Sequence, residues 1–215
     1  MDTSMLRLPV TLVASLVLPF CASASIIPEL QSGPVSLGGG NFLYVYQATV
    51  SDLERLDPTA TAGVTCASAS SPVTLIQCNP KGTFFTIYDV AGLNGAATMA
   101  ASLPAGWGVS FNSVGLTPST LTGNVPDDPS TLNVTFQYTG PVVQGPATIT
   151  GFDVISSDEG VALGFFSSQA TEKVNGLTHQ EDGFISVPVP EPASLALIGV
   201  GLIGLAVART RFQQD

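Results

Sequence analysis

The feature that most constrains the fold is a strict alternation of apolar and polar residues over positions 131–139. The apolar positions are Leu132, Val134, Phe136 and Tyr138. A period of two places these side chains on one face of a strand, so the segment predicts a strand in a sheet packed on one side. Similar but less regular runs occur at residues 42–50, 83–90, 107–111, 147–155 and 161–166.

Turn-forming residues separate these runs, because Gly, Pro, Asn and Asp gather at residues 38–40, 79–82, 94–95, 126–129 and 140–141. Short strands punctuated in this way, without long helices between them, are typical of antiparallel all-β proteins. We therefore predict an antiparallel β-sandwich, jelly-roll-like or Ig-like, over residues 25–187. Single helical turns are predicted only at residues 51–54, where Ser51 and Glu54 form a capping-box pattern, and at residues 96–103.

The first 24 residues have the pattern of a signal peptide. Arg7 precedes an apolar run over residues 8–20, and small residues follow it. Ala22 and Ala24 occupy the −3 and −1 positions of an A-x-A cleavage site, which accepts only small side chains. A buried core helix is the alternative interpretation. The pattern predicts cleavage after Ala24, so that the mature chain begins at Ser25.

The charge balance of residues 25–187 excludes one class of partner. Of the sixteen acidic side chains of the chain, all but Asp2, Glu191 and Asp215 lie in this segment. Its only strong bases are Arg55, Lys81 and Lys173. Nucleic acid would be repelled by such a surface, so we expect no nucleic-acid partner. The balance suits an exported domain.

Two cysteines, Cys66 and Cys78, are left in the mature chain, because Cys21 is removed with the signal peptide. An even number of cysteines in an oxidising compartment predicts a disulfide between them. Free buried thiols and a metal site are the alternatives, and the one histidine, His179, is a hundred residues away in the sequence. We expect neither a metal nor a cofactor.

Residues 193–208 form a continuous apolar stretch that ends at Arg209 and Arg211. As a helix it would be about 24 Å long, against about 30 Å for the hydrocarbon core, and arginine snorkelling could bridge the gap. The stretch therefore predicts a single transmembrane helix. Because basic residues stay on the cytoplasmic side, Arg209 and Arg211 would act as the cytoplasmic stop.

The residues before this helix form a recognisable tripeptide, Pro190-Glu191-Pro192. Proline fixes φ and disfavours helix in its predecessor, so the tripeptide is expected to be extended and accessible to a processing enzyme. Together with the glycine-rich helix and the basic end, it resembles the PEP-CTERM sorting signal. The resemblance covers residues 188–215, and phrases such as 84–89 and 132–140 resemble other β-rich proteins that carry such tails.

The resemblance implies a destination. PEP-CTERM proteins occur mostly in Gram-negative bacteria that make exopolysaccharide. An exosortase in the inner membrane is thought to recognise Pro190, Glu191 and Pro192, process the tail and pass the protein to the cell surface or extracellular matrix. The implied partners are the exosortase and the inner membrane, transiently, with exopolysaccharide as a further candidate.

The sequence gives few indications of a catalytic or ligand-binding site in residues 25–187. His179 lies in a polar segment and has no G-x-S-x-G motif to support a hydrolase, so an exposed loop histidine is expected. The acidic pairs Asp127-Asp128 and Asp158-Glu159 lack the spacing of a calcium loop and indicate solvated turns, with calcium as the alternative. The aromatic residues could form a sugar-stacking platform, although core packing is commoner. They are Trp107, Tyr44, Tyr46, Tyr88 and Tyr138.

Three functions remain open from the sequence. The leading one is a non-enzymatic surface or matrix protein with a structural or adhesive body. The second is a carbohydrate-binding module for exopolysaccharide, which an exposed aromatic row would favour. The third is an exported hydrolase, which a site joining His179 to other catalytic groups would favour.

Overall fold

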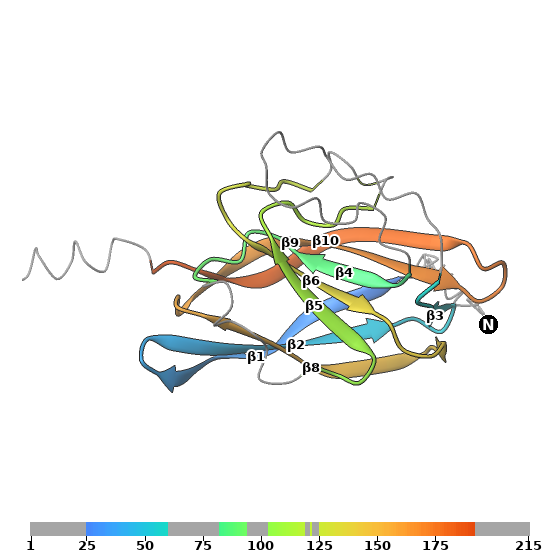
Figure 1. The fold of residues 1–215 in the computed structure, drawn as a ribbon, viewed down its shortest axis with the longest axis horizontal. Helices are drawn as coiled ribbons and strands as arrows, with labels where there is room; N and C mark the ends of the chain where they lie inside the picture. Colours follow the sequence, from blue (N-terminus) through green and yellow to red (C-terminus); the bar gives the residue numbers. More distant parts are fainter. Residues whose placement is uncertain (1–24, 60–81, 94–102, 119–120, 122–124, 192–215) are drawn as a thin grey trace, which may run out of the picture.

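The computed structural model describes residues 25–59, 82–93, 103–118, 121 and 125–191. The described residues form ten β-strands and no α-helix, and every pairing between strands is antiparallel (Figure 1). The prediction of an antiparallel all-β fold is confirmed. Its finer assignment to a jelly-roll-like or Ig-like sandwich stays a prediction.

The smaller sheet contains three strands in the order β1-β2-β8. These are β1 (Ile26–Gly38), β2 (Asn41–Val50) and β8 (Ala147–Ser156). The connection between β1 and β2 uses Gly38, Gly39 and Gly40, all three with positive φ. Glycine has no Cβ to clash in this region of φ, which is why three glycines in a row mark this turn. The turn predicted at residues 38–40 is confirmed.

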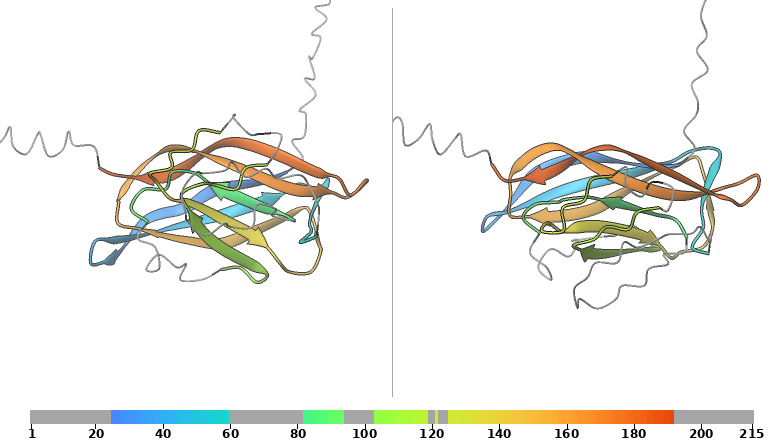
Figure 2. Two further views of the ribbon diagram at one scale, coloured as in Figure 1. Left: turned by 45° about the horizontal axis from the view of Figure 1, so that its top comes forward. Right: turned by 90° about the horizontal axis from the view of Figure 1, so that it is seen from above.

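The larger sheet contains seven strands, in the order β5-β6-β4-β9-β3-β7 with β10 paired to the other edge of β9. They are β3 (Glu54–Leu56), β4 (Phe84–Ile87), β5 (Trp107–Asn112), β6 (Asn133–Tyr138), β7 (Val143–Gln144), β9 (Gly160–Glu172) and β10 (Thr178–Val189). The β9–β10 hairpin runs the length of the body (Figure 2). The start of β1 and the end of β10 lie toward opposite ends of the long axis of the body (Figures 1 and 2).

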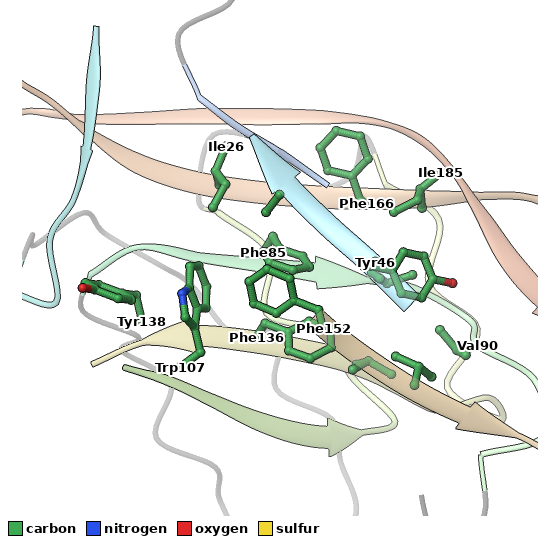
Figure 3. Close-up of a cluster of buried hydrophobic side chains, with 14 of the residues drawn as sticks. Ile26, Tyr46, Phe85, Val90, Trp107, Phe136, Tyr138, Phe152, Phe166 and Ile185 are labelled. Atoms are coloured by element: carbon green, nitrogen blue, oxygen red, sulfur yellow. The ribbon is translucent and has the colours of Figure 1, made fainter. Parts of the chain in front are cut away.

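The two sheets share an aromatic core (Figure 3). Phe152 of β8 meets Phe85, Trp107 and Phe136 of the larger sheet, with ring centroids 5.0, 4.9 and 5.1 Å away. Edge-to-face contacts of this kind add about 0.5–1.5 kcal/mol each to the free energy from area burial. The sugar-stacking alternative is wrong for the five aromatic residues named in the sequence, because all five are buried in the folded protein. They are Tyr44, Tyr46, Tyr88, Trp107 and Tyr138.

The larger sheet is covered on its second face as well, which differs from the expected one-sided packing. Thr135, on the polar face of β6, is buried and its hydroxyl pairs with that of Thr86 at 2.9 Å. Thr86 also donates to the carbonyl of Leu116. The segment around Leu116 thus lies over this face and satisfies its hydroxyl groups. A polar residue in an alternating strand can therefore be buried when its hydrogen bonds are supplied.

One local prediction needs correction, and another is not tested. Residues 51–54 form a hydrogen-bonded turn, not a helical turn: Leu53 N donates to Ser51 Oγ, and Glu54 N to Ser51 O. Glu54 is the first residue of β3 and pairs with Glu172 of β9. The residue that the capping-box pattern assigned to a helical turn therefore belongs to a strand. The helical turn predicted at residues 96–103 lies almost entirely outside the described residues.

Candidate functional site

The sorting segment begins where the sheet ends. Val189 is the last residue of β10 and is paired with Gly160, and the carbonyl of Pro188 accepts a hydrogen bond from Ala91 N. Pro190 has no N–H and cannot continue the ladder. Pro190 and Glu191 are both exposed. The body therefore presents the first two residues of the tripeptide directly from a fixed strand, with no linker between them.

Several predicted features lie outside the described residues. They are the signal peptide with Ala22 and Ala24, the cysteines Cys66 and Cys78, Pro192, the helix at 193–208, and Arg209 and Arg211. Within the part of the chain that is described, no helix has the length and apolar character needed to cross a membrane.

A group of polar side chains gathers at the opposite end of the body, on the core-facing side of β9. Ala170 belongs to the core, and directly opposite residues of an antiparallel pair share a face. His179 lies opposite Ala170, and Glu181 lies opposite Ser168. Glu54 lies opposite Glu172 at the end of the same strand. His179 is thus part of β10 and partly buried, so the expectation of an exposed loop histidine is wrong.

Glu54 is the unusual member of this group. Its side chain is 0% exposed, and within the described ranges neither carboxylate oxygen has a hydrogen-bond partner. The imidazole of His179 lies beside it, with Nδ1 3.9 Å from Glu54 Oε1. Burial raises the pKa of Glu54 to about 7, the negative charge of Glu172 adds to the rise, and Lys173 partly offsets it. An ionised Glu54 is therefore costly unless a cation approaches it.

Ser25 is tied to the same place by two hydrogen bonds. Its hydroxyl pairs with that of Ser168 at 3.0 Å, and its carbonyl accepts a hydrogen bond from Ser51 N. Ser51 O in turn accepts from the backbone N–H of Glu54. Ser25 is only 1% exposed. We call Ser25, Glu54, Ser168, His179 and Glu181 the buried polar cluster.

The buried polar cluster has an acid beside a histidine, which is part of what a hydrolase needs. A nucleophile would have to be hydrogen-bonded to the imidazole. The Ser168 hydroxyl is paired with Ser25 instead, and among the described residues no serine or threonine hydroxyl is hydrogen-bonded to His179. The cluster therefore brings an acid and a base together without the third group of a triad.

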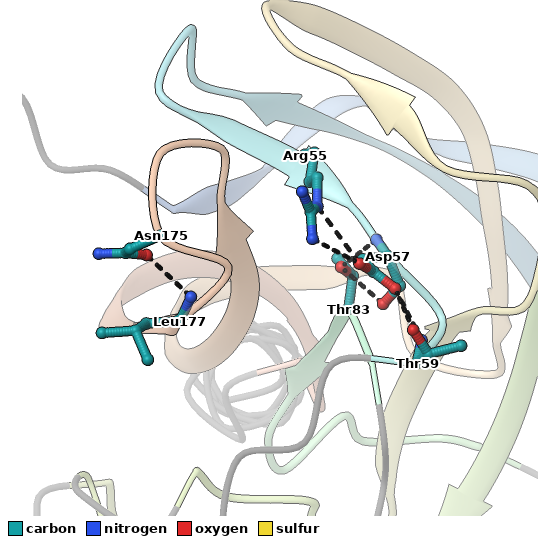
Figure 4. Close-up of polar contacts among 6 residues, drawn as sticks. All are labelled: Arg55, Asp57, Thr59, Thr83, Asn175 and Leu177. Atoms are coloured by element: carbon teal, nitrogen blue, oxygen red, sulfur yellow. Dashed lines mark hydrogen bonds and ion pairs between the residues drawn. The ribbon is translucent and has the colours of Figure 1, made fainter.

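A separate network fixes the end of β3 (Figure 4). The carboxylate of Asp57 accepts hydrogen bonds from Arg55 and from both the N–H and the hydroxyl of Thr59. Burial raises the pKa of Asp57, but the hydrogen bonds from Thr59 and Arg55 outweigh it and hold the pKa below its ordinary value. The backbone N–H of Asp57 also donates to Thr83 Oγ1 at 3.0 Å. The network holds β3 beside the start of β4 and is structural.

Both carboxylates of the acidic pair Asp127-Asp128 accept hydrogen bonds, and Asp127 is partly buried. Asp127 accepts hydrogen bonds from Gly115 N and from the amide of Asn133, and Asp128 accepts two from Ser130. The same amide group of Asn133, a formal glycosylation acceptor, is buried and accepts from Asp89 N. No set of three acidic, histidine or cysteine side chains in the described ranges is placed to hold a metal ion.

One aromatic pair has an exposed ring, and the sequence analysis did not single it out. Phe184 of β10 is 67% exposed, and its ring centroid is 4.9 Å from that of Phe165 directly opposite on β9. Leu163, two residues from Phe165 and therefore on the same face, is 75% exposed. The outer face of the β9–β10 hairpin therefore carries a small apolar surface.

Sequence reasoning also missed Glu54, Ser25 and Ser168 as members of one site. Their shared feature is burial of polar side chains on a common face, which depends on the pairing of β3, β9 and β10. The weak signal available was Glu181 alternating with His179 on a segment bounded by a turn. That alternation of polar residues gives no apolar face from which to recognise a strand.

An exposed Pro-Glu end that leaves a folded body directly is the geometry expected of a sorting signal. The family model of the PEP-CTERM protein-sorting motif matches residues 188–211 and confirms the resemblance seen in the sequence. The motif implies an exported protein that an exosortase sorts at the membrane to the cell surface. No curated protein matches the chain.

Proposed function

We propose that the protein is an exported surface or extracellular-matrix protein whose β-rich body has a structural or adhesive, non-enzymatic role. The observation that carries the proposal is the continuity between β10 and the motif matched at residues 188–211. A body joined to its sorting segment without a linker is held close to the membrane while the segment is processed. The incomplete set of catalytic groups in the buried polar cluster supports a role without catalysis.

Mass spectrometry of the protein isolated from the cell surface tests this proposal. The expected mature chain begins at Ser25 and ends before the apolar stretch at 193–208. A chain that keeps residues 193–208 at the surface would contradict processing by the exosortase. A chain that begins at Met1 would contradict signal cleavage, and the two ends are read independently in one experiment.

Binding of the cell's own exopolysaccharide is a second candidate, supported by the exposed ring of Phe184, which packs on the half-buried Phe165. Aromatic faces stack on sugar rings, and Phe184 is the large aromatic side chain that the described surface exposes most.

Phe184→Ala is expected to weaken retention of the mature chain in polysaccharide affinity electrophoresis by about tenfold, or 1.4 kcal/mol. Leu163→Ala is the matched control, because it removes an equally exposed apolar side chain that has no ring. Equal losses in both variants would indicate general apolar adhesion and not sugar stacking, and no loss in either would exclude this surface.

A further inference from the structure

Glu54 is the buried carboxylate of the buried polar cluster. The carboxylate is fully buried and has no hydrogen bond within the described residues, and burial of an ion without a partner is strongly unfavourable. The titratable groups near it are Glu172 at the end of β9, Lys173 directly after it, and His179 and Glu181 from β10. Two of the four are acids, and Glu181 has a buried oxygen without a partner of its own.

Lys173 is already engaged elsewhere. Its ammonium group donates hydrogen bonds to the carbonyls of Asp52 and Gly145, which turns it toward the β7 side of the sheet. Arg55 is paired with Asp57 at 3.0 Å. The strong bases of the described body are therefore occupied, and Glu54 is left with the imidazole of His179 at 3.9 Å.

Signal cleavage would create a new cation at this place. Cleavage after Ala24 converts the backbone nitrogen of Ser25 into a primary ammonium group. Ser25 is 1% exposed and is joined to Glu54 through Ser51, whose N–H donates to Ser25 O and whose carbonyl accepts from Glu54 N. The Ser25 hydroxyl holds the residue against Ser168, directly opposite Glu181.

We propose that the buried polar cluster is a binding site for a primary ammonium group, and that its ligand is the new α-amino group of Ser25, held by the carboxylate of Glu54. Removal of the signal peptide then supplies the cation that pairs with Glu54, at the end of the body where β1 begins. The precursor has a neutral amide at this position and leaves Glu54 without its cation. The inference rests on the proposed export with cleavage after Ala24.

The proposal sets a pH dependence with a definite sign. Without the ammonium group, the pKa of Glu54 is about 7 in the folded protein against 4.5 ordinarily, so the folded state loses stability as the pH rises between these values. A bound ammonium group lowers that pKa and removes part of the loss. The stabilising effect of the free amine is therefore absent below about pH 4.5 and largest near pH 7.

Equilibrium unfolding of the chain 25–215 in detergent, followed by the fluorescence of Trp107, tests the proposal. One sample has the free amine, and the other is acetylated at Ser25 while unfolded in denaturant below pH 7, where the α-amine has its ordinary pKa and lysine amines stay protonated and unreactive, and is then refolded. At pH 7 the acetylated chain is expected to have an unfolding equilibrium constant about tenfold larger, which corresponds to one pKa unit. At pH 4 the two constants are expected to agree within about twofold, because Glu54 is then protonated in both samples.

The variant Glu54→Gln keeps the shape of the side chain and is expected to abolish the difference at pH 7. Glu159→Gln is the matched control, because it removes the same charge from an exposed turn and is expected to preserve the difference. A difference that survives in Glu54→Gln, or that is equal at pH 4 and pH 7, would overturn the proposal.

The pKa of the Ser25 amine gives a second readout that does not depend on unfolding. Nuclear magnetic resonance titration of the labelled amine is expected to give a value at least one unit above the ordinary 7.7–8.0, and a return to that range in Glu54→Gln. An ordinary value in both chains would contradict the ion pair. Both samples begin at Ser25 by preparation. These results therefore do not depend on the position at which the signal peptide is cleaved in the cell.

Discussion

Replacement of Pro190, Glu191 and Pro192 by alanine is expected to leave nearly all of the protein as a membrane-retained precursor. Alanine frees φ at two positions and favours helix, so the apolar helix predicted at 193–208 can extend upstream into the tripeptide. The change also removes the carboxylate of Glu191, which is exposed directly after β10. The processing enzyme then meets neither the extended backbone nor the charge. Fractionation of cells and immunoblotting of membrane and surface fractions measure the outcome.

The control for this experiment is alanine at Gln213, Gln214 and Asp215, which follow the matched residues 188–211. That variant is expected to reach the surface as the wild type does. Glu191→Gln separates the two causes, since it keeps both prolines and removes only the charge. Normal release of the triple alanine variant at 190–192 would refute the sorting role of the tripeptide.

The variant Phe152→Ala is expected to destabilise the body by about 3–5 kcal/mol, the usual cost of truncating a buried phenylalanine. The large value follows from position, because Phe152 is fully buried and contacts aromatic rings of three strands in the opposite sheet. Its loss leaves a cavity at the interface between the sheets. Denaturant unfolding followed by Trp107 fluorescence measures the effect, since Trp107 is the one tryptophan of the chain.

Phe184→Ala makes the same chemical change at a largely exposed position and is the control for stability. It is expected to cost less than about 1 kcal/mol, since little apolar surface leaves water on folding at that site. Similar losses in Phe152→Ala and Phe184→Ala would mean that the two sheets do not share the core described above.

The sequence predicted the strands that carry an apolar face and missed those that do not. Alternation over 131–139 placed β6, and the runs at 42–50 and 147–155 placed β2 and β8 within a residue or so. β10 was missed over its whole length, Thr178–Val189, because polar residues occupy both of its faces as far as Gly183 and leave a regular apolar face only at its end. Strand β1 was missed because its pairing with β2 shifts register three times, which disrupts the alternation.

The sorting motif matched at residues 188–211 could be recognised from the sequence, and the buried polar cluster could not. Recognition of Pro190-Glu191-Pro192 depends on neighbouring residues, so a linear pattern suffices. The cluster joins Ser25, Glu54 and His179, which are distant in sequence and are brought together by strand pairing alone. Glu54 illustrates the difficulty, since its local pattern with Ser51 favours a helix cap and tertiary pairing overrides it.

The direct passage from β10 into the sorting segment has a mechanical consequence. A protein tethered at its C-terminal side receives the drag of moving liquid as tension on Val189, directed along β10. The twelve residues of β10 are paired with β9 along their whole length, and ladder hydrogen bonds lie perpendicular to the strands. Tension along the strand therefore loads these hydrogen bonds in shear, and the force is distributed over all of them. The strand that positions the sorting segment is also the one that resists being pulled out of the body.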